Sequence, residues 1–117
     1  MSILQAGAWT APRNLGVEIN TPGNEVFPFV DEYNTLYFSS DGHDGLGGLD
    51  IFSAASAGGS WSKPENLKLP INSGADDYGL WLTKAKPKDA NDPVRMSGFF
   101  SSNRPGGKGK DDIYQFQ

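Results

Sequence analysis

The chain has 117 residues, and its 15 Gly and 8 Pro place a residue that disfavours helix interiors at about a fifth of the positions. It has no Cys, which excludes a disulfide scaffold, a zinc ribbon, a thiol nucleophile and an iron–sulfur site. The formal net charge of −4 argues against a nucleic-acid partner. The sequence contains no run of 18 apolar residues, so it predicts no membrane-spanning helix. With 37% hydrophobic residues, we expect one small all-β domain whose short strands are joined by Gly-rich turns.

The sequence contains an internal repeat. GAWTAPRNLGVEIN at 7–20 matches GSWSKPENLKLPIN at 59–72 in seven of fourteen positions. FSSDGHDGLGGLDIF at 38–52 matches FSSNRPGGKGKDDIY at 100–114 in seven of fifteen. The offset rises from 52 to 62 because the second copy carries ten extra residues. We therefore divide the chain into repeat 1 (7–58) and repeat 2 (59–117), with an insertion at 84–94.

Each repeat is predicted to form four short antiparallel strands. Pro28 falls inside one of them, so that strand should lie at a sheet edge, where its missing N–H is tolerated. Four strands in about 50 residues is the spacing of a β-propeller blade, and we predict two such blades. The predicted strands are 9–15, 25–30, 35–40 and 50–54 in repeat 1, and 61–67, 77–83, 96–102 and 112–116 in repeat 2.

The strand and loop motifs have a recognisable form. W-x-x-P-x-N-L, F-S-S-D-G-H-x-G-L-G-G-L-D-I-F and F-S-S-N-R-P-G-G-K-G-x-D-D-I-Y resemble the WD-like β-propeller repeat of TolB-type proteins. They are similar to a version found in exported Bacteroidota proteins, often joined to tetratricopeptide repeats and an outer-membrane-protein-A-like domain. The resemblance covers residues 9–116, and departs from the pattern at the insertion and at 80–82.

That resemblance implies a non-catalytic scaffold for protein–protein contacts, located in the periplasm or at the outer membrane. It brings no catalytic residues. The location rests on the resemblance alone, because residues 1–7 lack the basic and apolar regions of a signal peptide. A carbohydrate-binding or calcium-assisted propeller, and a fragment of a larger propeller without a function of its own, are the alternatives.

The number of blades poses a structural problem. Propellers close with four to eight blades, and this chain supplies two. In the resembling repeat the Trp-containing segment completes the preceding blade, so we expect 61–67 to complete the first blade and 9–15 to lack one. A head-to-tail homo-oligomer of three or four chains would supply the missing strand, as would a longer parent chain. Repeat 1 has one base against seven acids (−6) and repeat 2 nine against seven (+2), which fits either arrangement.

The Gly/Asp loops are candidate calcium sites. The segment 106–113 fits the nonapeptide pattern of calcium-binding β-rolls, but repeat 1 has Leu49 where repeat 2 has Asp111. We expect these loop acids to accept backbone N–H groups, with calcium as the alternative and no other cofactor. The weak candidate ligands are Asp41, Asp44, Asp50, Asp111 and Asp112.

A few other side chains are candidates for contacts. Ser39–Ser40 and Ser101–Ser102 recur at matching strand ends without an accompanying base, so we expect no enzyme. Trp81 has no Trp counterpart and is a candidate for stacking on a glycan, although we expect it to pack in the core. His43, the one His, is expected to be an exposed loop residue. The partner or ligand candidates are His43, Trp81, Lys84, Lys86, Lys88 and Arg104, and the structural repeat positions are Trp9, Trp61, Asp50 and Asp112.

Overall fold

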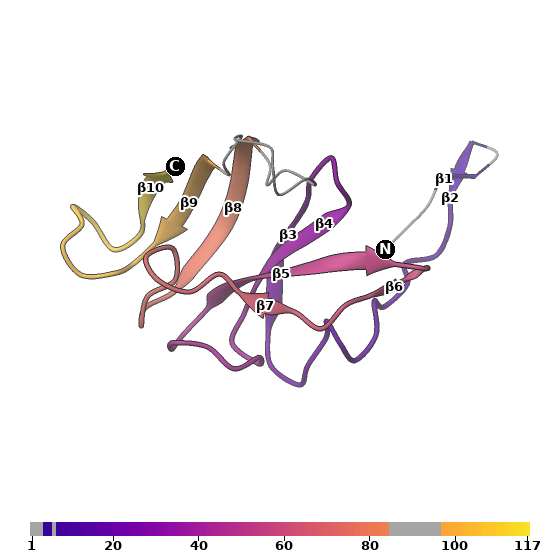
Figure 1. The fold of residues 1–117 in the computed structure, drawn as a ribbon, viewed down its shortest axis with the longest axis horizontal. Helices are drawn as coiled ribbons and strands as arrows, with labels where there is room; N and C mark the ends of the chain where they lie inside the picture. The colour runs from indigo at the N-terminus through magenta and orange to yellow at the C-terminus, as the bar shows by residue number, and fades with distance from the viewer. Residues whose placement is uncertain (1–3, 6, 85–96) are drawn as a thin grey trace, which may run out of the picture.

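The computed structural model describes residues 4–5, 7–84 and 97–117, and this part of the chain is all-β with no helix. The strands form two antiparallel sheets and a separate two-stranded hairpin (Figure 1). The predicted all-β antiparallel class is therefore confirmed. Neither sheet closes on itself within the described residues.

The first sheet comes from repeat 1 and the beginning of repeat 2. Its strands are β3 (Glu25–Val30), β4 (Thr35–Ser40), β5 (Asp50–Ala57) and β6 (Ser60–Trp61), in that order, and β7 (Glu65–Asn66) also pairs with β5. The segment 61–67 thus joins the first sheet, as predicted. It does so through two short pairings rather than one strand, because Pro64 has no N–H to donate.

The second sheet has three strands, in the order β10 (Asp112–Phe116), β9 (Ser97–Ser102) and β8 (Asp77–Lys84). Among the described residues β10 pairs only with β9, so its other edge is open. Its counterpart β5 is paired along both edges, with β4 on one side and with β6 and β7 on the other. The two repeats therefore differ at this outer edge.

The strand predicted over 9–15 is not found. Only β2 (Ala8–Trp9) forms a strand there, and it pairs with β1 (Leu4–Gln5) in a hairpin that projects away from both sheets (Figure 1). Residues 10–15 form no ladder, because the described part of the chain places no strand edge beside them. Trp9 is exposed, whereas Trp61 packs on the core.

The buried apolar side chains form two cores. The first core contains Ile19 and four first-sheet residues, with Leu15 and Trp61 packed against it. The second core joins the sheets, since Tyr37 and Ile51 of the first sheet pack against residues of β8 and β9. The first-sheet members of the first core are Leu36, Phe38, Phe52 and Ala54, and the β8 and β9 members of the second are Leu80, Leu82 and Phe100.

Both sheets carry a β-bulge in the strand that lies at their shared side. In β3 the register shifts between Val26 and Phe29, and in β8 between Tyr78 and Trp81. Phe27 and Gly79 occupy the same repeat position and both have positive φ, 55° and 68°. Gly adopts this conformation without cost, whereas Phe27 holds it against its side chain.

Candidate functional site: repeated joints and an open surface

In repeat 1 a polar joint ties the start of β3 to the end of β4. The carboxylate of Glu25 accepts hydrogen bonds from the Thr21 N–H (2.8 Å), the Thr21 hydroxyl (2.5 Å) and the Ser40 hydroxyl (2.7 Å). Burial raises the pKa of Glu25, but these hydrogen bonds outweigh it and hold that pKa below its ordinary value. The joint is therefore built to hold an ionised carboxylate.

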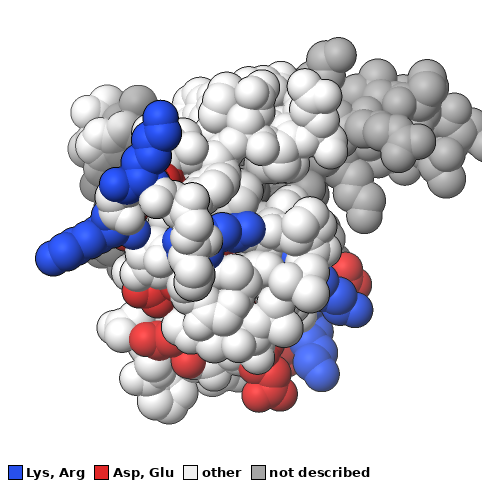
Figure 2. All heavy atoms as spheres, turned by 90° about the vertical axis from the view of Figure 1, so that its left-hand side faces the viewer, with Lys and Arg blue, Asp and Glu red and all other residues white. Residues whose placement is uncertain are grey.

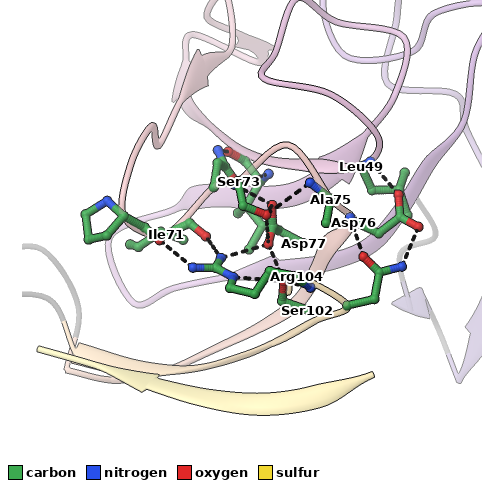
Figure 3. Close-up of polar contacts among 12 residues, drawn as sticks. Leu49, Ile71, Ser73, Ala75, Asp76, Asp77, Ser102 and Arg104 are labelled. Atoms are coloured by element: carbon green, nitrogen blue, oxygen red, sulfur yellow. Dashed lines mark hydrogen bonds and ion pairs between the residues drawn. The ribbon is translucent and has the colours of Figure 1, made fainter. Parts of the chain in front are cut away.

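Repeat 2 makes the same joint around Asp77 (Figure 3). The Asp77 side chain is fully buried. Asp77 accepts from the Ser73 N–H (2.7 Å), the Ser73 hydroxyl (3.0 Å) and the Ser102 hydroxyl (2.7 Å). Arg104 adds an ion pair at 2.8 Å. Ser40 and Ser102, weighed in the sequence as possible nucleophiles, thus both donate their hydroxyl to a joint carboxylate.

A second pair of side chains is repeated with its members exchanged. In repeat 1 Asp41 accepts from the N–H of Asn24 (2.7 Å) and from its side-chain amide (3.1 Å). In repeat 2 the N–H of Asp76 donates to the side-chain oxygen of Asn103 (2.8 Å), whose amide donates back to the Asp76 carboxylate (3.1 Å). A comparison by identity counts both positions as mismatches, although the joint is the same.

His43 is not an exposed loop residue. It is partly buried, its Nε2 is bonded to the Ile19 carbonyl at 2.7 Å, and its ring packs on Phe38 and Phe52. As a neutral or charged donor at Nε2, it fastens the segment before β3 to the first sheet. The prediction of an exposed side chain was wrong because the sequence does not show that the loop folds back onto these two rings.

Arg104 does the same in repeat 2. Its guanidinium donates to the carbonyls of Pro70 (2.8 Å) and Ile71, and it lies 5.1 Å from the ring centroids of both Phe100 and Tyr114. Figure 3 shows it extended between Ile71 and Asp77. Because five donors and a flat cation suit this set of acceptors and rings, its contacts are those of a structural residue.

The segments that precede β3 and β8 also share one local structure. Asn14 accepts from the Gly16 N–H (2.8 Å) and from the amide of Asn20 (3.0 Å). Asn66 accepts in the same way from the Lys68 N–H (2.6 Å) and from the amide of Asn72 (2.8 Å). The N–H of Asn20 and that of Asn72 each donate to the carbonyl four residues earlier, at 2.8 Å. The two segments are therefore folded alike.

The candidate calcium loops are held by their own acids. Asp50 accepts the Leu46 N–H, and Asp112 accepts the Gly109 N–H at 3.1 Å. Burial raises the pKa of Asp50, opposed by the backbone N–H groups of Leu46 and Gly47. The Oδ1 of Asp50 is buried and has no hydrogen-bond partner among the described residues.

The other loop acids are dispersed. Asp41 is bonded to Asn24, and the carboxylate of Asp111 accepts from Tyr78, which raises the pKa of Tyr78 to about 12. Within the described ranges no three His, Cys, Asp or Glu side chains gather as metal ligands. Asp44 instead lines an open hollow of about 480 Å³ with Leu46 and Leu69.

Trp81 does not lie in the core. It is 61% exposed and its ring lies 5.2 Å from that of Phe29, while Phe27 stacks on Tyr78 at 5.0 Å. The core prediction failed because the described residues place no third sheet against Trp81, whereas its counterpart Phe29, which follows the same bulge in β3, packs on the second core. Of the predicted lysines, Lys84 is in β8, and Lys86 and Lys88 lie outside the described residues.

Comparison with protein-family models, with curated proteins and with solved structures found no match. No helix within the described ranges is long and apolar enough to cross a membrane.

Proposed function

We propose that this chain is a non-catalytic β-propeller module of two blades that serves as a rigid scaffold for protein–protein contact. The observation that carries the proposal is the repetition of the joints. Glu25 and Asp77 collect the same three kinds of donor at matching positions, and the Asn24–Asp41 pair returns as Asp76–Asn103. The recurrence of the same hydrogen bonds at matching positions of two segments is typical of a repeat architecture.

The packing of the sheets supports the same function. The second core lies between two antiparallel sheets whose first three strands follow the same order, β3–β4–β5 and β8–β9–β10, so each repeat covers a face of the other, as neighbouring units of a repeat protein do. The second sheet leaves apolar side chains and a strand edge open on the opposite side. Apolar surface beside an unpaired edge is typical of a protein-binding surface. By its resemblance to exported repeats, we place the module at a Gram-negative cell envelope.

The test is capture of partners from envelope extracts with two baits. The wild-type chain and Ile113→Asp, altered at an exposed side chain of β10, are compared by quantitative mass spectrometry. The proposal expects proteins enriched on the wild-type bait and lost on the variant, with equal thermal stability of the two baits. Equal capture by both baits, or a hydrolytic activity of the purified chain, would contradict it.

A glycan-binding function is the second candidate, and the exposed aromatic row favours it. Phe27, Tyr78, Phe29 and Trp81 form two ring pairs, of which Trp81 and Phe27 are exposed, and flat exposed rings are platforms on which sugars stack. A glycan array with and without calcium tests this candidate. Binding lost in Trp81→Ala but kept in Trp9→Ala, which removes an exposed ring from the hairpin, would support it. No bound glycan would end it.

A further inference from the structure

The contact between β5 and the segment that follows it provides a template. The Ile51 N–H donates to the side-chain oxygen of Asn72 (2.6 Å), and the Ile51 carbonyl accepts from the Asn72 amide (2.8 Å) and the Leu67 N–H (3.1 Å). Asn66 and Glu65 then continue as β7 along the edge of β5. One buried Asn and a short strand thus fasten the edge of β5.

Repeat 1 contains a counterpart of the segment 66–72, and the described residues place no strand edge beside it. Residues 14–20 are folded like 66–72, with the Asn14–Asn20 bond in place of the Asn66–Asn72 bond. Within the described part of the chain the Asn20 side chain bonds to Asn14 alone, whereas the Asn72 side chain also bonds to both the N–H and the carbonyl of Ile51. Because the segment is already folded, little ordering would be needed for it to take a strand.

The residue that corresponds to Ile51 is Ile113, at the open edge of β10. Ile51 is 0% exposed and Ile113 77%; Tyr37, beside Ile51 on the second core, is 2% exposed, and its counterpart Phe99 is 37% exposed. The sheet face that packs against Ile51 and Tyr37 shows the same difference. Leu82 of β8 is 9% exposed there, and its counterpart Val30 in β3 is 50% exposed. Four of the five side chains buried in the second core, all but Phe100, therefore have an exposed counterpart in the other repeat. The counterpart of Phe100 is Phe38, which is buried in the first core.

Charge and surface character fit a second copy at this edge. Repeat 1, which carries the receiving segment, has a net charge of −6, and repeat 2, which carries β10, has +2. Because the two repeats have charges of opposite sign, a contact between repeat 2 of one copy and repeat 1 of another is favoured over a contact between two identical repeats. Figure 2 faces the side on which β10 lies in Figure 1, and uncharged atoms cover much of it, with basic and acidic groups among them.

We infer that the edge of β10 binds residues 13–20 of a second copy of this chain, head to tail. Asn20 of the second copy brackets the backbone of Ile113, and the Leu15 N–H donates to the Ile113 carbonyl. Asn14 and Arg13 lie opposite Tyr114 and Gln115, as Asn66 and Glu65 lie opposite Phe52 and Ser53 within the chain. The inference rests on the proposed scaffold function and names its partner.

The test uses the absence of Cys from the chain. Arg13→Cys and Gln115→Cys are made as two separate proteins, which are mixed and oxidised, because the Cα atoms of paired strand residues lie within disulfide range. A head-to-tail contact gives dimers in the mixture at least about tenfold above either protein alone, since each single variant lacks the matching thiol. The double variant Ser53→Cys/Glu65→Cys is the matched control, and it should close a disulfide within one chain.

Light scattering with size-exclusion chromatography supplies the second measurement. The mass of the wild type should rise with concentration, and Asn20→Ala and Ile113→Asp should each weaken association about tenfold or more with an unchanged melting temperature. Asn72→Ala, the counterpart within the chain, should instead lower the melting temperature. Cross-linking of either single variant with itself, or a monomer at every concentration, overturns the inference. A monomer that still captures an envelope protein through Ile113 leaves the proposed function standing, whereas a monomer that captures nothing defeats both.

Discussion

The carboxylate of Asp41 accepts two hydrogen bonds from Asn24, one from the backbone N–H at 2.7 Å and one from the side-chain amide at 3.1 Å. The N–H and then the amide lower the pKa of Asp41 below its ordinary value, so the pair holds the ionised form. Repeat 2 makes the same pair with Asp76 and Asn103 exchanged. One acid and one amide are needed, and either may come first along the chain.

This exchange predicts a rescue between two substitutions. Asn24→Asp places two carboxylates together, and Asp41→Asn leaves two amides without a charge between them, so each variant should unfold at a lower urea concentration than the wild type. The double variant rebuilds the pair as repeat 2 has it and should recover more than half of the summed loss. Urea unfolding of the four proteins measures the coupling, and strictly additive losses would contradict the equivalence of the two joints.

Arg104 and His43 form a matched pair for a second prediction. Arg104→Ala removes the partner of the buried Asp77 and should lower the free energy of unfolding by about 3 kcal/mol. His43→Ala removes the bond to the Ile19 carbonyl without leaving a buried charge unpaired, and should cost about 1 kcal/mol. Chemical denaturation measures both, and a larger loss for His43→Ala would show that the Asp77 joint is held by its hydroxyl donors alone.

Glu25 predicts how stability depends on pH. Its pKa in the folded chain lies below the ordinary value of 4.5, so its contribution is complete above that value and is lost as the pH falls through the folded pKa. Asp50, with a raised pKa, acts in the opposite sense: its contribution is present below 3.8 and is lost as the pH rises through its folded pKa.

The two carboxyls can be separated by substitution. Between pH 6 and pH 3, Glu25→Gln should lose less stability than the wild type, and Asp50→Asn should lose more, because the opposing contribution is gone. Urea unfolding at several pH values gives these slopes. Parallel slopes for all three proteins would refute the assignment.

Gly45 and Gly74 provide a fourth prediction. A Cβ on Gly45 would overlap Oδ2 of the buried Asp50, whereas a Cβ on Gly74 would meet only the Leu46 carbonyl oxygen, at 3.8 Å. Gly45→Ala should therefore cost about 2 kcal/mol, and Gly74→Ala, without a positive φ, should be close to neutral. Thermal unfolding of the two variants checks the difference, and equal melting temperatures would contradict it.

The sequence predicted the strands well where a neighbouring strand exists in the chain. Repeat spacing placed β3 to β5 and β8 to β10 nearly at their bounds, and Pro28 correctly indicated an edge. The strand prediction failed at 9–15. The repeat pattern shows that this segment is able to pair with a strand, but it forms a strand only where the described chain offers an unpaired strand edge beside it.

The side chains of the joints were harder to predict. Identity matching finds Ser40 and Ser102, but passes over Asn24–Asp41, whose signal is a pair of reciprocal mismatches. The roles of His43 and Arg104 were also missed, since an imidazole and a guanidinium have no sequence similarity, although they bond to the carbonyls of equivalent Ile residues, Ile19 and Ile71. Such equivalence becomes visible only when the two repeats are compared atom by atom.

The bulges of β3 and β8 have a consequence for how the chain avoids aggregation. Both strands are sheet edges, yet each is interrupted at the same repeat position, and β3 also carries Pro28, which has no N–H. Interrupted edges of this kind resist the addition of further strands. β10 has a continuous register from Asp112 to Phe116. Among the described strands, β3 and β8 therefore have interrupted edges that resist pairing, whereas β10 has a regular edge at which a strand can add. Assembly through β10 is consequently directional.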